Sequence, residues 1–108
     1  MRTPDLDGPF SLGALAAPPR TVSSRALLKA GGGSATAFAF AEGGGLGEHS
    51  TPHEALLVVT GGEARVTIGG AVHAVGPGEA LRLPASVPHA VRAATPFQML
   101  LVVLRDAP

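Results

Sequence analysis

The sequence predicts an all-β protein, built as a closed or sandwiched antiparallel sheet. Short runs of residues alternate between apolar and polar, which is the periodicity of a strand with one buried face. Glycine pairs separate many of these runs, as in tight turns between neighbouring strands. No apolar spacing of helical period extends far enough to indicate a helix. We therefore expect an antiparallel β-barrel or jelly roll, because closure or sheet pairing protects the strand edges.

The composition limits both the organisation and the chemistry of the chain. A length of 108 residues favours one domain. The absence of cysteine excludes disulfides, thiolate metal sites and cysteine nucleophiles. Eight basic residues balance eight acidic ones, so neither nucleic acid nor an anionic membrane is an expected partner. Aromatic residues make up only 4% of the chain, so Ala, Val and Leu have to form most of the core.

The N-terminal segment differs from the rest. Residues 1–20 mix Pro, Gly and Asp with short apolar stretches and show no lasting period, so we expect an irregular arm held in part by Phe10 and Leu12. Prolines and aspartates interrupt the region where a secretion signal needs a continuous apolar run. No segment reaches the ~20 apolar residues of a membrane span. We expect a cytoplasmic protein whose barrel domain covers residues 21–108.

Eight strands are predicted in this domain, and most of them end at glycine or proline. They cover residues 22–28, 35–41, 54–60, 63–68, 71–75, 80–83, 89–93 and 97–104. Residues 46–53 are expected to form a loop. The strands 54–60 and 97–104 are apolar at both parities, which is typical of strands covered on both sides.

Four histidines are the leading candidates for a functional site. His49 and His53 lie in the predicted loop, and His73 lies in a short strand where a surface position is expected. His89 begins a strand and shares a face with Val91. The arginine of that strand has the opposite parity, so we expect the His89 side chain to point inward.

Glu54 raises a separate question. It shares parity with Leu56 and Val58, so an inward face would carry its carboxylate into the interior, where an unpaired charge is costly. A divalent metal would compensate that charge, because two imidazoles and a carboxylate are a known ligand set for non-heme Fe(II) and also suit Mn, Ni or Zn. The alternatives are that the histidines are hydrogen-bonded or surface residues and that Glu54 is exposed or paired with an arginine.

Two segments of the chain resemble the motifs of the cupin family. The first motif is G-x5-H-x-H-x3,4-E-x6-G, and the second is G-x5-P-x-G-x2-H-x3-N. The matching residues are His49, Glu54 and Gly61 in the first motif and Gly78, Pro84 and His89 in the second. Ser86 stands where the second motif has its inner glycine. The likeness spans residues 45–93 and implies a short single-domain cupin with a small β-barrel or jelly-roll fold.

The resemblance also implies a ligand set. His49, Glu54 and His89 fall on family positions that hold a divalent metal, here Fe, Mn, Ni or Zn. Gly47 replaces the first histidine of the motif, so one of the four family ligands is missing. His53 aligns with no family ligand, but a β-bulge beside it could turn its side chain inward and supply a fourth donor.

An apolar pocket is expected beside this ligand set. Its predicted wall consists of Phe38, Phe40, Leu56, Val58, Val91, Phe97 and Met99. The wall contains no phenol or indole donor, so a small, mostly apolar or chelating ligand suits it better than a sugar.

Three functions are compatible with these residues. The first is a metal-dependent enzyme such as an oxygenase or isomerase, in which the metal acts as a Lewis acid. The second is a non-catalytic binding or sensor module without bound metal. The third treats the histidines as relics in a stable dimer. No general acid or base can be assigned from the sequence, so it does not decide whether the protein is an enzyme.

A homodimer is expected because two strands carry a second apolar face. The residues of that face are Ala55, Leu57, Val59, Leu100, Val102 and Leu104. An exposed face of this kind needs a cover, and a second subunit is the simplest one.

Overall fold

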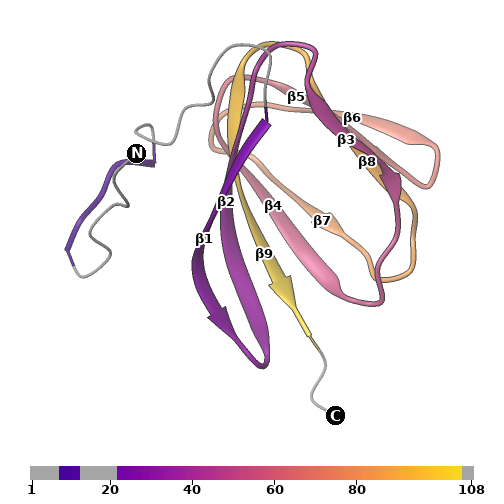
Figure 1. Cartoon of the computed structure of the whole chain (residues 1–108). Coiled ribbons are helices and arrows are strands. Elements are labelled where there is room, and N and C mark those ends of the chain that lie inside the picture. Colours follow the sequence, from indigo (N-terminus) through magenta and orange to yellow (C-terminus); the bar gives the residue numbers. More distant parts are fainter. Residues whose placement is uncertain (1–7, 13–21, 106–108) are drawn as a thin grey trace.

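The computed structural model describes residues 8–12 and 22–105, which contain nine β-strands and no α-helix (Figure 1). The strands are β1 Val22–Ala30, β2 Gly33–Phe40, β3 Gly45–His49, β4 Glu54–Gly61, β5 Ala64–Ile68, β6 Ala71–Val75, β7 Ala80–Leu83, β8 His89–Ala93 and β9 Phe97–Leu104.

The strands form two antiparallel sheets that pack against each other (Figure 1). The five-stranded sheet has the order β1-β2-β9-β4-β7, and the four-stranded sheet has the order β3-β8-β5-β6. The first and last described strands, β1 and β9, both pair with β2, so chain ends that are distant in sequence lie in one sheet. The predicted all-β fold with a jelly-roll or barrel arrangement is confirmed.

One apolar core lies between the sheets and contains residues of both. Its buried members are Phe40, Leu57, Val59, Ala64, Val66, Val75, Leu83, Val91, Ala93, Phe97 and Met99. The rings of Phe40 and Phe97 stack with centroids 4.5 Å apart and an interplanar angle of 3°. Aromatic side chains are scarce in this protein, so each of these rings fills a large share of the space that the small alanine and valine side chains leave.

β3 was not expected as a strand, because residues 46–53 were predicted to form a loop. In the structure, β3 pairs with β8 at the edge of the four-stranded sheet, and its register shifts between Leu46 and His49. Its sequence contains two glycines and a single large apolar residue, so no alternating pattern marks it. Gly45 suits this position because a Cβ there would overlap the carbonyl oxygen of Val91 on β8.

The inward face of β4 is the opposite of the predicted one. Leu57 and Val59 are fully buried, whereas Leu56 is 43% exposed. Both parities of this strand are apolar, so the sequence offers no polar marker for the outer face. The pairing with β7 determines which face of β4 is buried, because Leu57 lies opposite Leu81, which packs against the core. Leu57 and Val59 therefore belong to the core and not to the outer face.

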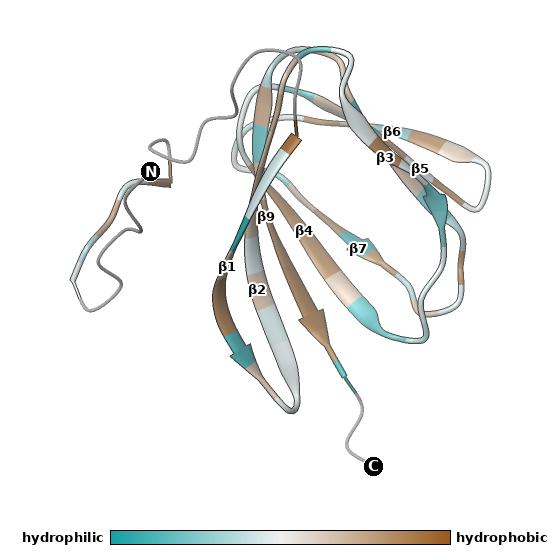
Figure 2. Ribbon diagram, in the orientation of Figure 1, coloured by the Kyte–Doolittle hydropathy of each residue, from teal (hydrophilic) through white to brown (hydrophobic). Residues whose placement is uncertain are grey.

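The outer face of the five-stranded sheet is nevertheless apolar, as expected for β9. Figure 2 shows β4 and β9 as largely hydrophobic along their length. Leu28, Leu56 and Leu104 are exposed, and Leu100 and Val102 are half-buried. On β9, Phe97 and Met99 face the core, so the predicted faces of that strand are correct.

Most of the predicted N-terminal arm lies outside the described residues. Within residues 8–12, Phe10 is 37% exposed and Leu12 is half-buried. No helix in the described part of the chain is long and apolar enough to cross a membrane.

Candidate functional site

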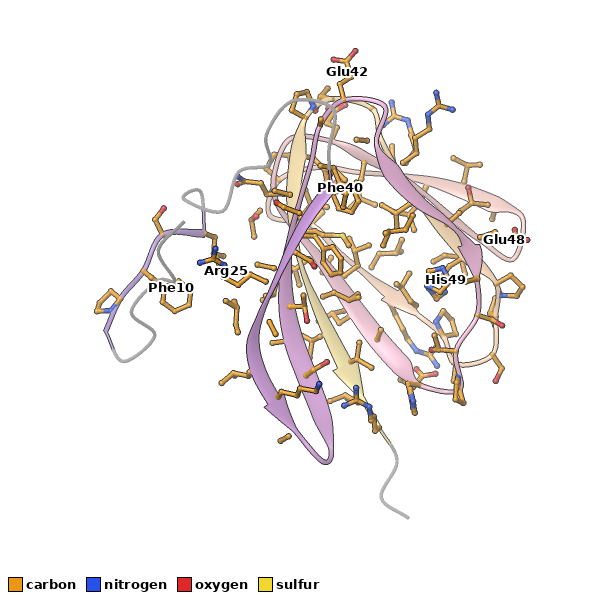
Figure 3. All side chains as sticks on the ribbon, in the orientation of Figure 1. Phe10, Arg25, Phe40, Glu42, Glu48 and His49 are labelled. Atoms are coloured by element: carbon orange, nitrogen blue, oxygen red, sulfur yellow. The ribbon has the colours of Figure 1, made fainter. Side chains whose placement is uncertain are left out.

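Two imidazoles meet where β3 ends and β8 begins. His49 is the last residue of β3 and His89 the first of β8, and the two residues are direct cross-strand partners. Their ring centroids lie 4.4 Å apart in an edge-to-face arrangement with an interplanar angle of 68°. Figure 3 shows His49 on the side of β3 that faces the other sheet, with Glu48 pointing away. We call His49 and His89 the histidine pair.

Backbone carbonyls hold both rings. Nδ1 of His49 lies 2.8 Å from the carbonyl oxygen of Gly47, and Nδ1 of His89 lies 3.3 Å from that of Val87. A carbonyl oxygen only accepts, so Nδ1 is the donor in each contact. A ring that carries a single proton therefore carries it on Nδ1 and has its lone pair on Nε2. This is the form in which histidine binds a metal or accepts a hydrogen bond from a ligand.

The two rings differ in their exposure. His89 is 7% exposed and is the buried polar residue of the described core, whereas His49 is exposed. Burial lowers the pKa of His89 most, the nearby His49 lowers it further, and the hydrogen bond to Val87 acts in the opposite direction. His89 is therefore a neutral imidazole near pH 7, as the sequence-based inward orientation requires.

Glu54 does not join the histidine pair. Nε of Arg82 donates to its Oε1 over 2.6 Å, and the backbone N–H of Ala85 donates to its Oε2 over 2.6 Å. The bond to Arg82 and then the bond to Ala85 hold the pKa of this carboxyl below its ordinary value. The expected inward carboxylate is wrong, because β4 turns its other parity to the core. The alternative of an arginine partner is the observed one.

His53 is half-buried in the segment that leads into β4. Its backbone N–H and carbonyl both bond to the hydroxyl of Thr51, at 3.2 and 3.3 Å. Among the residues that the structure describes, no three His, Cys, Asp or Glu side chains are grouped so that they could hold a metal ion. The structure brings the two imidazoles together, but the His/Glu/His set implied by the resemblance does not assemble, and His53 does not complete it.

The predicted pocket residues fall into two groups. Phe40, Val91, Phe97 and Met99 are buried in the core, and Phe38 packs against it, with its ring centroid 5.9 Å from that of Phe40. Leu56 and Val58 lie on the opposite face of β4, so their assignment to the pocket wall is wrong. The reason is the reversed parity of that strand.

The sequence does not single out Arg82 and Ala85 as partners of Glu54. Arg82 lies at the parity of β7 opposite to that of the buried Leu83, so an outward arginine could be expected. The sequence allows an arginine partner for Glu54 but does not identify it as Arg82, because the two residues are 28 positions apart and meet only through the pairing of β4 with β7.

Two antiparallel sheets around one core, with a histidine pair at the end of two neighbouring strands, define a small β-barrel protein with a candidate ligand site. The Cupin_2 family, described as "Cupin domain", matches residues 37–103. The chain therefore belongs to the cupin family.

Solved structures agree with this assignment. A conserved protein of unknown function from Streptococcus pyogenes is 30% identical, with a TM-score of 0.88 over 94% of this chain and 90% of that one. A cupin superfamily protein from Desulfitobacterium hafniense is 27% identical, with a TM-score of 0.84 over 88% and 87%. A cupin 2 conserved barrel domain protein from Leptotrichia buccalis is 30% identical, with a TM-score of 0.82 over 88% of this chain but 46% of that one. No curated protein matches the chain.

Proposed function

We propose that this cupin binds a small, mostly apolar or chelating molecule at the histidine pair, together with a divalent metal (Fe, Mn, Ni or Zn) held by His49 and His89. The observation that carries the proposal is the approach of two rings to 4.4 Å, each with Nδ1 held by a carbonyl and Nε2 left with its lone pair. Imidazole nitrogen is a donor that these metals share.

The residues around the pair have defined tasks in this proposal. The carbonyls of Gly47 and Val87 orient the rings, as outer partners of metal-binding histidines commonly do. Val91 follows His89 at the same parity of β8 and is buried, so it provides apolar surface beside the inner ring. A bound metal would supply Lewis-acid polarisation of a ligand oxygen. His49 and His89 would fill only two coordination positions of the metal and leave the others to water and ligand. A chelating ligand would therefore strengthen metal binding.

The second candidate is a binding module that uses no metal. The engagement of Glu54 by Arg82 and Ala85 favours it, because the anionic ligand of the family set is occupied elsewhere. In this case the Nε2 atoms of the pair accept hydrogen bonds from hydroxyl or N–H groups of the small molecule, and the apolar wall binds its remainder.

Metal binding can be tested on untagged protein purified without chelator. Elemental analysis and calorimetric titration with Zn²⁺, Ni²⁺, Mn²⁺ and Fe²⁺ should show one site that His49→Ala and His89→Ala both remove. His73→Ala is the matched control, because His73 is an exposed histidine on β6, the far edge of the same sheet. Equal metal content in wild type and His89→Ala would overturn the metal proposal.

A ligand panel separates the two candidates. Diketones, phenols and thiols should be tested for binding with and without metal, and O₂ consumption should be followed with the iron-loaded protein. Ligand binding that depends on the metal supports the first candidate. Equally tight binding after chelator treatment, lost in His89→Ala, supports the second.

A further inference from the structure

We propose that Glu54 is a positioning residue that fastens the β7–β8 loop, residues 84–88, and thereby sets the orientation of His89. It occupies the position of a carboxylate ligand in the family motif, but in this chain it takes a different role. Glu54 binds the loop that leads to His89 in the site of the proposed function. Its positioning role depends on the proposed metal binding only in the Zn²⁺ experiment below.

Both oxygens of the carboxylate are used to join separate parts of the chain. Oε1 accepts from Arg82 on β7, and Oε2 accepts from the backbone N–H of Ala85 in the loop, each at 2.6 Å. Glu54 itself begins β4. Hydrogen bonds to an ionised acceptor are shorter and stronger than neutral ones, as these distances illustrate. Glu54 therefore ties the start of one strand to the end of its neighbour and to the loop that follows.

The residue after Ala85 needs such support. Ser86 has a φ of 62°, a left-handed conformation that is costly for a residue other than glycine, and it stands at a glycine position of the family motif. Its N–H donates to the carbonyl of Thr51 at 2.7 Å. The bond from Ala85 to Glu54 and the bond from Ser86 to Thr51 act on consecutive peptide groups. The first leads to the start of β4 and the second to the segment between β3 and β4. Together they hold the backbone in this unfavourable conformation.

The loop carries the group that orients His89. The carbonyl of Val87 is the acceptor for Nδ1 of His89, so a shift of the loop moves the atom that determines the ring's tautomer and direction. The other loop bonds are the 3.4 Å contact from Val87 to Pro84 and the 2.9 Å bond from Gly69 to Pro88. Both are longer than the bond from Ala85 to Glu54 and the bond from Ser86 to Thr51. We therefore assign the bonds of Ala85 and Ser86 the main role in holding the loop.

A ligand role and a positioning role for Glu54 predict different effects of Arg82. To bind a metal at the histidine pair, the carboxylate would have to leave both Arg82 and Ala85, so removal of Arg82 would release it and strengthen metal binding. If Glu54 positions the loop, removal of Arg82 loosens the same structure as removal of Glu54. The two substitutions should then act in the same direction.

The first experiment uses the metal-free protein. In Glu54→Ala, amide hydrogen exchange at Ala85 and Ser86 should accelerate about tenfold, the change expected from the loss of one charge-assisted bond, and the ring ¹⁵N resonances of His89 should shift. Glu54→Gln keeps an acceptor for Ala85 and should show a smaller effect, as should Arg82→Met.

Glu63→Gln is the matched control for this experiment. Glu63 is exposed and pairs with Arg65 at 3.9 Å. Among the described residues, no hydrogen bond joins Glu63 to the loop of residues 84–88. This variant should leave Ala85, Ser86 and His89 unchanged. Unchanged exchange at Ala85 together with unchanged His89 resonances in Glu54→Ala would overturn the proposal.

The second experiment compares Zn²⁺ affinity in the same variants. We expect Glu54→Gln and Arg82→Met to lower the affinity by similar factors of about ten or less, while His89→Ala abolishes binding. Loss of binding in Glu54→Gln with stronger binding in Arg82→Met would establish Glu54 as a ligand and overturn the inference. If wild type binds no metal at all, the proposed metal function fails, but the exchange and resonance measurements still decide the role of Glu54.

Discussion

At the scale of single residues, this site depends on two histidines with unequal surroundings. His89 is buried beside Val91 and the core, whereas His49 lies over it at the exposed edge strand. Only the His89 ring loses its hydration through burial. The pair therefore combines the neutral imidazole of His89, which is held in the core, with the imidazole of His49, which solvent and ligand can reach. A small molecule can therefore approach the pair from the side of His49.

The lowered pKa of His89 predicts a pH dependence of stability in the metal-free protein. The unfolded chain binds this proton at the ordinary value of 6.5, while the folded protein binds it only at lower pH because of burial and the neighbouring His49. At pH values between the folded and the unfolded pKa of His89, the unfolded state holds more protons. The contribution of the neutral His89 ring to the free energy of unfolding is therefore complete above about pH 6.5 and is lost as the pH falls through the lowered pKa of the folded protein.

Urea unfolding at closely spaced pH values, with an NMR titration of the His89 ring, checks this prediction. The free energy of unfolding should decrease from pH 7.5 toward pH 5, and His89→Gln should have a smaller decrease over that range. His49→Ala should raise the pKa of His89 part of the way to its ordinary value. A ring that titrates at or above 6.5 would contradict the prediction.

At the scale of elements, the orientation of β4 controls which side chains reach the site. The strand turns Leu57 and Val59 to the core, and Glu54 consequently lies with Leu56 on the other face. A strand that is apolar at both parities can pack either way, and a shift of one residue in its register would exchange the two faces. The role of Glu54 thus follows from the register of the whole strand.

Substitutions on the two faces of β4 test this orientation. Leu57→Ala should reduce the free energy of unfolding by ~2–5 kcal/mol, because it removes a fully buried side chain and leaves a cavity. Leu56→Ala is the matched control on the same strand. Measured at a protein concentration at which the chain is monomeric, it should cost below ~1 kcal/mol, since Leu56 is 43% exposed in the single chain. Denaturant unfolding of both variants at pH 7.5 measures the difference, and equal losses would show that the two faces are not distinguished.

At the scale of the whole molecule, one sheet presents an apolar outer face. Its strands β1, β2, β9, β4 and β7 contain nine, eight, eight, eight and four residues, and at ~3.3 Å per residue and ~4.8 Å between strands they span an area on the order of 600 Å². Two whole faces of this size would together approach the ~1,200 Å² at which specific, stable interfaces begin, although Ala37 and Ala39 on this face are already buried within the chain. The opposite sheet carries Arg65 and Arg92 as cross-strand partners, so its outer face is more polar. The five-stranded sheet is therefore the expected surface for a second copy.

Light scattering tests the expected homodimer. The mass should be near twice the 10.7 kDa of the chain. Leu56→Arg places a charge on the outer face of the five-stranded sheet and should give monomers. Val72→Arg is the control, because Val72 is 66% exposed on the other sheet and its substitution should leave the dimer intact. A wild-type mass near 10.7 kDa would rule the dimer out.

Much of the fold follows from local patterns, whereas the site does so only in part. The strands with polar residues at one parity were predicted close to their observed limits, and the arginine opposite His89 marked the outer face of β8. β3 escaped prediction because an edge strand rich in glycine has no alternating pattern. Within the site, the position of His89 was predictable and the partner of Glu54 was not.

The sequence by itself determined the all-β class, the strand and turn order after Gly61, the cupin resemblance and the inward direction of His89. Those features depend on neighbouring residues, whose parity and spacing are visible in the chain. Only the tertiary structure decided that His49 lies across from His89, that Leu57 and not Leu56 enters the core, and that Arg82 and Ala85 bind Glu54. Each of these depends on which strands pair and in what register, and hydrogen bonding between distant segments selects that register.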